Sequence, residues 1–188
     1  MPRQLSDYTN QFFWTFKKMD NVNYNFEIVE ILYKAKSQNG NDLLFNKPIT
    51  ILLVAMIECM LEDFMVRIKT HSSEVIPNLV QSVVAAIRGK QLDKFGHVIV
   101  QVEKHNLLRV ASGDTIYAEL EFLRKVRNRM HIQEMDGGLD KDEYQIFTDL
   151  TRKKAERAFE RTCEVLCNIH PRWGSAPLPM ADFPRPWI

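Results

Sequence analysis

The segment 48–69 is apolar around most of its circumference, and this limits what the whole chain can fold into. At helical spacing it carries a broad apolar face, made of Leu53, Met56, Ile57, Met60, Phe64 and Ile68. Ile51, Val54 and Leu61 add apolar character on the far side, as expected for a helix that is covered by other elements. Pro48 suits the first turn of that helix, where its missing N–H is not needed. The segment therefore predicts a central helix around which the rest of the chain packs.

Helical periodicity continues through most of the remaining chain. It predicts further helices over 5–19, 24–36, 77–88, 92–108, 116–131 and 141–169. Gly89 is expected to cap one of them at its C-terminus, and Asp114 to cap another at its N-terminus. Asp140 with Glu143 resembles a capping box for the last helix. The β-branched run 98–102 could be extended, but no other segment offers a strand to pair with it. The predicted fold class is all-α, an antiparallel bundle of about five to seven helices.

The C-terminal segment 171–188 has a different composition from the rest. It holds five of the eight prolines, together with Trp173, Phe183 and Trp187, so it cannot be helical throughout. We therefore divide the chain into a helical domain, 1–170, and an extended Pro/Trp-rich arm, 171–188. So many aromatic side chains favour an arm that lies over the domain or over a protein partner.

Composition excludes several classes of function. A chain of 188 residues that is 45% hydrophobic can bury one core, and a net charge of +1 argues against bulk electrostatic binding of nucleic acid. The longest apolar stretch, 49–57, is too short to span a membrane, and no signal-peptide pattern begins the chain. Three cysteines favour a reducing, cytoplasmic setting, and the pair Cys163 and Cys167 lacks a second ligand pair. We expect no metal site, no cofactor and no membrane partner.

The best functional clue is the basic end of the helix 116–131. Its apolar stripe is formed by Ile116, Leu120, Leu123 and Met130, and at 100° per residue Arg127 falls close to the centre of that stripe. His131 lies one turn beyond Arg127 and Arg124 lies two turns before His131, with Asn128 at the flank and Arg129 next to it. A cation on an apolar face must meet something polar or anionic.

Two interpretations of this cluster stay open. Two guanidiniums, an imidazole and an amide suit a phosphate, and a histidine there could remove the 2′-OH proton of RNA while an arginine stabilises the phosphoryl oxygens. Alternatively, Arg127 pairs with Glu58 or Glu62 of the central helix in a structural ion pair. A second basic run, 152–161, is interpreted as a solvated helix face.

The cluster also carries a family resemblance. A long-helix bundle in which a late helix ends in Arg-Asn-x-x-His, here Arg127, Asn128 and His131, resembles the HEPN superfamily. The hallmark of that superfamily is an Arg followed by a polar residue, with a His four to six residues further along. Arg124 has the expected spacing to His131 but is followed by Lys125, whereas Arg127 has the expected follower at a shorter spacing. The resemblance covers roughly residues 48–168, including the acidic, apolar stretch that contains Glu58.

The resemblance implies a homodimer in which two such helices face each other across one composite site. Many HEPN proteins are metal-independent ribonucleases of toxin–antitoxin or other defence systems, and others are binding modules without catalysis. For this chain it implies His131 as general base, Arg127 or Arg124 as phosphate stabiliser, Asn128 and Arg129 as substrate contacts, and Glu58 or Glu62 as supporting acid. The expected partner is RNA. The second possibility is a non-catalytic protein-interaction module that uses the C-terminal arm. A third is a bundle that binds nucleic acid, a nucleotide or another small ligand.

Overall fold

The computed structural model describes residues 3–40, 42–71, 76, 78–129 and 142–188, and every regular element within them is helical. The elements are α1 (Leu5–Phe12), α2 (Phe16–Gln38), η1 (Leu43–Phe45), α3 (Asn46–Thr70), α4 (Gln81–Arg88), α5 (Phe95–Lys104), α6 (Ile116–Asn128), α7 (Glu143–Ile146), α8 (Asp149–Asn168) and η3 (Met180–Asp182). The all-α prediction is confirmed for this part of the chain. The described residues form eight α-helices, one more than the seven segments predicted, because the predicted last helix is divided in two.

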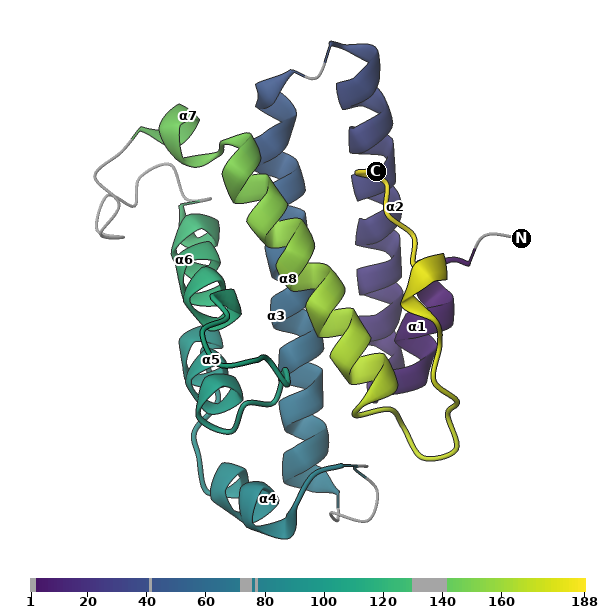
Figure 1. Ribbon diagram of the computed structural model, residues 1–188, viewed down its shortest axis with the longest axis vertical. Coiled ribbons are helices and arrows are strands. Elements are labelled where there is room, and N and C mark those ends of the chain that lie inside the picture. The colour runs from purple at the N-terminus through teal and green to yellow at the C-terminus, as the bar shows by residue number, and fades with distance from the viewer. Residues whose placement is uncertain (1–2, 41, 72–75, 77, 130–141) are drawn as a thin grey trace.

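Helix α3 is the centre of the fold, as its apolar circumference predicts. It contacts α2, α4, α5, α6 and α8, and Figure 1 shows it between α2 on one side and α5 and α6 on the other, with α8 crossing in front. Leu53, Ile57, Met60 and Leu61 have no exposed surface, so both sides of the helix are covered. Helix α5 includes the β-branched run that could have been extended, and Gly89 caps α4 as expected.

The predicted helix 5–19 is wrong, because the chain turns sharply between α1 and α2. Phe13 is fully buried at this corner, and the backbone N–H groups of Trp14 and Thr15 donate to the Asp63 carboxylate of α3 at 2.7 and 3.1 Å. A side-chain acceptor from another helix thus replaces the carbonyls that a continuous helix would supply. Helix α2 then begins at Phe16 rather than near residue 24.

The predicted helix 141–169 is also wrong in one respect, because it is broken at Phe147 and Thr148. Thr148 is the N-cap residue of α8, and its side chain accepts a hydrogen bond from the Thr151 backbone N–H. Ile146 and Phe147 are buried against Val126 of α6, forming a small second hydrophobic cluster. The break therefore lets these two residues reach α6. Asp140, the expected start of this helix, lies outside the described residues.

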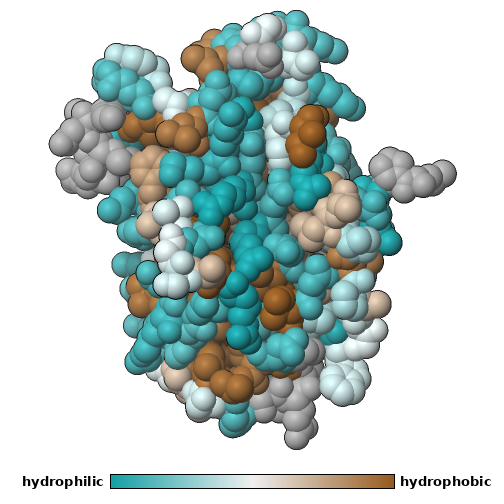
Figure 2. Space-filling model, viewed as in Figure 1, coloured by the Kyte–Doolittle hydropathy of each residue, from teal (hydrophilic) through white to brown (hydrophobic). Residues whose placement is uncertain are grey.

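The C-terminal segment 171–188 lies against the helical part of the molecule (Figure 1). Phe183 is 4% exposed and belongs to the main core, while Trp187 contacts the rings of Phe26, Tyr33 and Phe159. The segment therefore supplies side chains to the core itself. In the described part of the chain, no helix combines the length and apolar character needed to cross a lipid bilayer. Figure 2 shows hydrophilic side chains running down the middle of this face, over α8.

Candidate functional site

The basic end of α6 opens onto a surface pocket of about 280 Å³. Arg124, Arg127 and Asn128 line it from α6, and Glu58 lines it from α3. The opposite wall is the start of α5, at Lys94, Phe95 and Gly96. Four of the residues that the sequence singled out thus meet at one place, together with an element that the sequence did not connect to them.

Arg127 does not lie at the centre of the apolar stripe of α6, as the periodicity predicted. The stripe runs through Ile116, Leu120 and Leu123 to Val126, which is fully buried, because the last step is three residues rather than four. Arg127 therefore falls at the margin of the stripe, where its side chain is 26% exposed. This placement gives the guanidinium access both to the core helix α3 and to solvent.

The Arg127 guanidinium forms an ion pair with the Glu58 carboxylate of α3, which confirms the structural pair considered from the sequence. Only Nη2 contacts the carboxylate, and the buried Nε has no hydrogen-bond partner among the described residues. Burial raises the pKa of Glu58 above its usual value, and the nearby Arg127 offsets this only in part. The pair is therefore not a fully satisfied one, and Arg127 keeps donor capacity for a ligand.

Arg124 is held differently, by a carboxylate of its own helix. Its Nε and Nη2 donate to the two carboxylate oxygens of Glu121 at 2.8 and 2.6 Å, a bidentate pair. This hydrogen bonding raises the pKa of Arg124 and lowers the pKa of Glu121. The guanidinium packs directly over Gly96, since a Cβ there would lie 3.5 Å from Arg124 Nε. Arg124 is thus fixed against the first turn of α5.

The pocket has the features of an anion-binding site. Three cationic side chains, Lys94, Arg124 and Arg127, line it together with one carboxylate, Glu58. It also lies at the N-terminus of α5, where the first backbone N–H groups of a helix have no intrahelical partner and the helix dipole is positive. Guanidinium groups and a helix N-terminus together favour a phosphate group.

The remaining predicted site residues are distributed as follows. Glu62 does not reach the pocket; its carboxylate lies 3.7 Å from Lys18 Nζ of α2. Arg129 is the C-cap residue of α6 and is partly buried. His131 lies outside the described residues. Of the two candidate supporting acids, the structure therefore brings only Glu58 to an arginine of the cluster.

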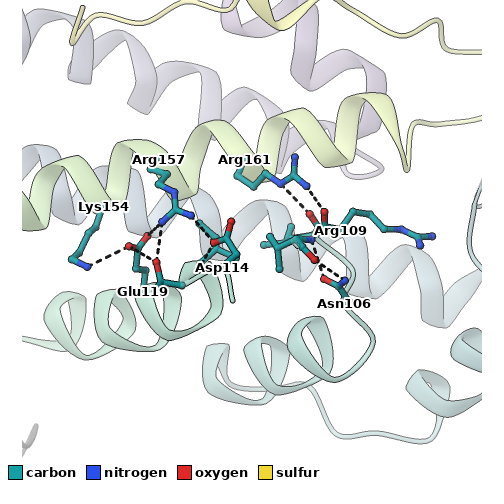
Figure 3. Close-up of polar contacts among 11 residues, drawn as sticks. Asn106, Arg109, Asp114, Glu119, Lys154, Arg157 and Arg161 are labelled. Carbon is teal, nitrogen blue, oxygen red and sulfur yellow. Dashed lines mark hydrogen bonds and ion pairs between the residues drawn. The ribbon is translucent and has the colours of Figure 1, made fainter. Parts of the chain in front are cut away.

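The second basic run is only in part the solvated face that its composition suggested, because Lys153 and Arg157 are exposed but most of its arginines form ion pairs or hydrogen bonds within the fold. Figure 3 shows Arg157 between Asp114 and Glu119, and Arg161 donating to the backbone carbonyl of Arg109. These side chains fasten the segment 106–115 and the start of α6 to α8. Asp114 also accepts from the Ile116 backbone N–H at 2.9 Å, although the N-cap residue of α6 is Thr115.

Arg152, at the start of the same run, is buried rather than solvated. It contacts the Glu156 carboxylate, Tyr33 Oη at 3.1 Å and Asn46 Oδ1 at 3.1 Å. The Arg152 guanidinium therefore ties α8 to α2 and α3. These bonds occupy most of its donors, so we assign Arg152 no role in a site.

The sequence did not indicate Lys94, Phe95 and Gly96 as site residues. The available signal was Gly96, a residue unfavourable inside a helix that here leaves room for Arg124. The described residues hold no cluster of three or more His, Cys, Asp or Glu side chains that could bind a metal ion. Comparisons with protein-family models, with curated proteins and with solved structures find no match to this chain.

Proposed function

We propose that this chain is a HEPN-like antiparallel helical bundle that acts as a homodimer and cleaves RNA without a metal ion. The observation that carries the proposal is the convergence of Arg124, Arg127 and Lys94 on the N-terminus of α5 in one surface pocket. A phosphate group is the ligand that such a set of donors favours, and in this proposal RNA supplies it.

The proposed reaction uses a group of the substrate as nucleophile. His131 removes the proton from a ribose 2′-OH, O2′ attacks the adjacent phosphorus in line, and the bond from phosphorus to O5′ breaks. Arg127 stabilises the negative charge that builds on the non-bridging oxygens. The products are one fragment with a 2′,3′-cyclic phosphate and one with a 5′-hydroxyl group, which takes its proton from water. In the sequence, His131 is three residues beyond the last residue of α6 and four residues beyond Arg127.

Between the two arginines, we assign the phosphate contact to Arg127. Arg124 donates hydrogen bonds from both Nε and Nη2 to Glu121, whereas Arg127 donates to Glu58 from Nη2 alone. Arg127 therefore retains more donors for the phosphate, and Glu58 orients it from α3. Asn128 stands beside it in the pocket and can donate from its amide.

The experiment compares RNA cleavage by the wild-type protein with cleavage by His131→Ala and Arg127→Met, all in EDTA. We expect both variants to lose activity by at least about 100-fold, the usual size of a lost acid–base or charge-stabilising group. Lys125→Met is the matched control, because it removes a cation from the same helix. The Lys125 side chain is 44% exposed, and its Nζ lies 3.9 Å from Glu121 Oε1. Equal activity of wild type and His131→Ala would overturn the assignment.

A second candidate is a non-catalytic binding module, and the ion pairs favour it. Both arginines already have carboxylate partners, Glu58 and Glu121, so neither needs a ligand to balance its charge. In this case RNA binds without being cut, or the C-terminal segment contacts a protein partner. A protein that binds RNA at the α6 pocket and leaves it intact in the assay above supports this candidate instead.

A further inference from the structure

A second surface pocket, of about 440 Å³, lies on the other side of α3. It is lined by Trp14 at the corner between α1 and α2, by Arg67 near the end of α3, and by the four residues Arg172, Trp173, Gly174 and Ser175. Arg67 is nine residues beyond Glu58, which corresponds to half a turn around the helix and about 14 Å along it. The two pockets therefore face opposite sides of α3.

Arg67 lines this pocket and is 1% exposed, so it is the most buried charged residue of the lining. Its Nη1 and Nη2 donate to the backbone carbonyls of Phe12 and His170, and its Nε has no hydrogen-bond partner among the described residues. Burial lowers the pKa of Arg67 to about 10. Asp63 stabilises this charge, but the two hydrogen bonds of the guanidinium go to neutral carbonyls, so an anion in the pocket would stabilise the buried charge further.

The charges around Arg67 leave the pocket positive. Asp63 raises the pKa of Arg67 and Arg172 lowers it, so one carboxylate stands against two guanidiniums. The Asp63 carboxylate is also engaged, because it accepts the backbone N–H groups of Trp14 and Thr15. The pocket is therefore suited to a ligand with at least one negative charge.

The walls of the pocket are aromatic. Trp14 is 43% exposed and Trp173 is 78% exposed. Trp173 stands on a tight turn in which the Ser175 N–H donates to the Arg172 carbonyl at 3.1 Å and Gly174 has a φ of +81°. Arg172 anchors this turn to α1 by two hydrogen bonds to backbone carbonyls, one of 2.6 Å to Gln11 and one of 2.7 Å to Asn10. The exposed indole is thus presented by a fixed segment rather than by a loose end.

We propose that this pocket binds a nucleotide, with its base on the Trp14 and Trp173 indoles and its phosphate at Arg172 above the Arg67 guanidinium. Indole rings stack on any base because every base has a π-face, and guanidinium groups match phosphate oxygens. The nucleotide is either a free mononucleotide or one unit of an RNA strand. The assignment does not depend on cleavage at the α6 pocket.

The test is calorimetric titration of the full chain with adenosine 5′-monophosphate, adenosine and inorganic phosphate. We expect the monophosphate to bind with a Kd below about 1 mM, and the base or the phosphate alone to bind at least about tenfold more weakly. Titration of the Arg127→Met variant, whose α6 pocket is altered, with hexa-adenylate distinguishes the two sources. Tighter binding of the oligonucleotide than of the monophosphate assigns the site to an RNA strand, and equal or weaker binding assigns it to a free nucleotide.

Trp173→Ala is the deciding variant, because this side chain is 78% exposed and lies outside the core. Arg172→Met is the second variant; it also removes the side-chain bond to the Asn10 carbonyl, so its melting temperature is compared with that of the wild-type protein to separate a lost phosphate contact from a loosened turn. Each should weaken binding of adenosine monophosphate by about tenfold. Tyr144→Ala, which removes another highly exposed aromatic ring, should leave it unchanged. Absence of binding, or equal binding by Trp173→Ala, Arg172→Met and wild type, would overturn the inference. Equal affinity for phosphate and for the monophosphate would contradict the stacking that defines the ligand.

Discussion

Replacing Glu58 with glutamine tests whether the α6 pocket binds RNA phosphate. Three cations and the Glu58 carboxylate line this pocket, so Glu58→Gln raises its formal charge by one and leaves the size of the side chain nearly unchanged. The change also frees the Arg127 Nη2 from its ionic partner. If a phosphate binds there, the variant should bind RNA more tightly than the wild-type protein.

The expected gain in affinity follows from Coulomb's law. A phosphate on the far side of the Arg127 guanidinium would lie about 7 Å from the Glu58 carboxylate, a repulsion of about 2 kcal/mol at an effective dielectric constant of about 20. The Glu58 and Arg127 side chains are 20% and 26% exposed, so solvent screens part of this repulsion. We therefore expect Glu58→Gln to tighten RNA binding by about 1 kcal/mol, or about fivefold.

The assay is fluorescence anisotropy with a single-stranded RNA that carries 2′-O-methyl groups, which block attack by O2′. The matched control is Glu62→Gln, since Glu62 is one turn along the same helix but pairs with Lys18 instead. It makes the same change in net charge without altering the pocket. If Glu58→Gln binds RNA no more tightly than Glu62→Gln at each salt concentration, the assignment of this pocket to phosphate is refuted.

Three further predictions concern stability. The pKa of Glu58 in the folded protein is raised above its ordinary value of 4.5, so protonation of Glu58 stabilises the folded state below pH 4.5, and this stabilisation is lost as the pH rises through the raised pKa. Thermal melts should therefore show the wild-type protein losing stability relative to Glu58→Gln over that pH range. An equal pH dependence of the two melting temperatures would contradict this. Arg152→Met should cost about 3–5 kcal/mol in urea unfolding, because it leaves Glu156 buried without a charge partner, and the neighbouring Lys153→Met should cost less than about 0.5 kcal/mol; similar costs would contradict the buried pair. Trp187→Ala should cost about 2 kcal/mol by urea unfolding if the C-terminal segment contributes to the core, and an unchanged midpoint would show that it does not.

The sequence predicted the helices whose apolar positions are numerous and regular. Helix α3 begins and ends within two residues of its predicted bounds, because its buried face is decided by the helix itself. The breaks near residues 14 and 147 could not be predicted, since each depends on a partner distant in sequence. The break near residue 14 depends on the Asp63 carboxylate, and the break near residue 147 depends on packing against the buried Val126.

The candidate site was predicted in part for a similar reason. Arg124, Arg127 and Asn128 are close in sequence on one helix, so their convergence follows from helical geometry. The contribution of α5 depends on tertiary packing, and only Gly96 hinted at a close approach. The prediction that Arg127 lies at the centre of the apolar stripe was wrong by one position, because Val126 takes that place and packs against Ile146 and Phe147.

The chemistry of the product ends tests the central claim most directly. Wild-type protein in EDTA should convert an RNA of defined sequence into fragments with 2′,3′-cyclic phosphate and 5′-hydroxyl ends, as read by end labelling and mass spectrometry. A 2′-deoxy substitution at the cleaved nucleotide should stop the reaction, and so should His131→Ala. Cleavage that persists in either case, or products that carry a 5′-phosphate, would contradict an attack by the ribose 2′-hydroxyl assisted by His131.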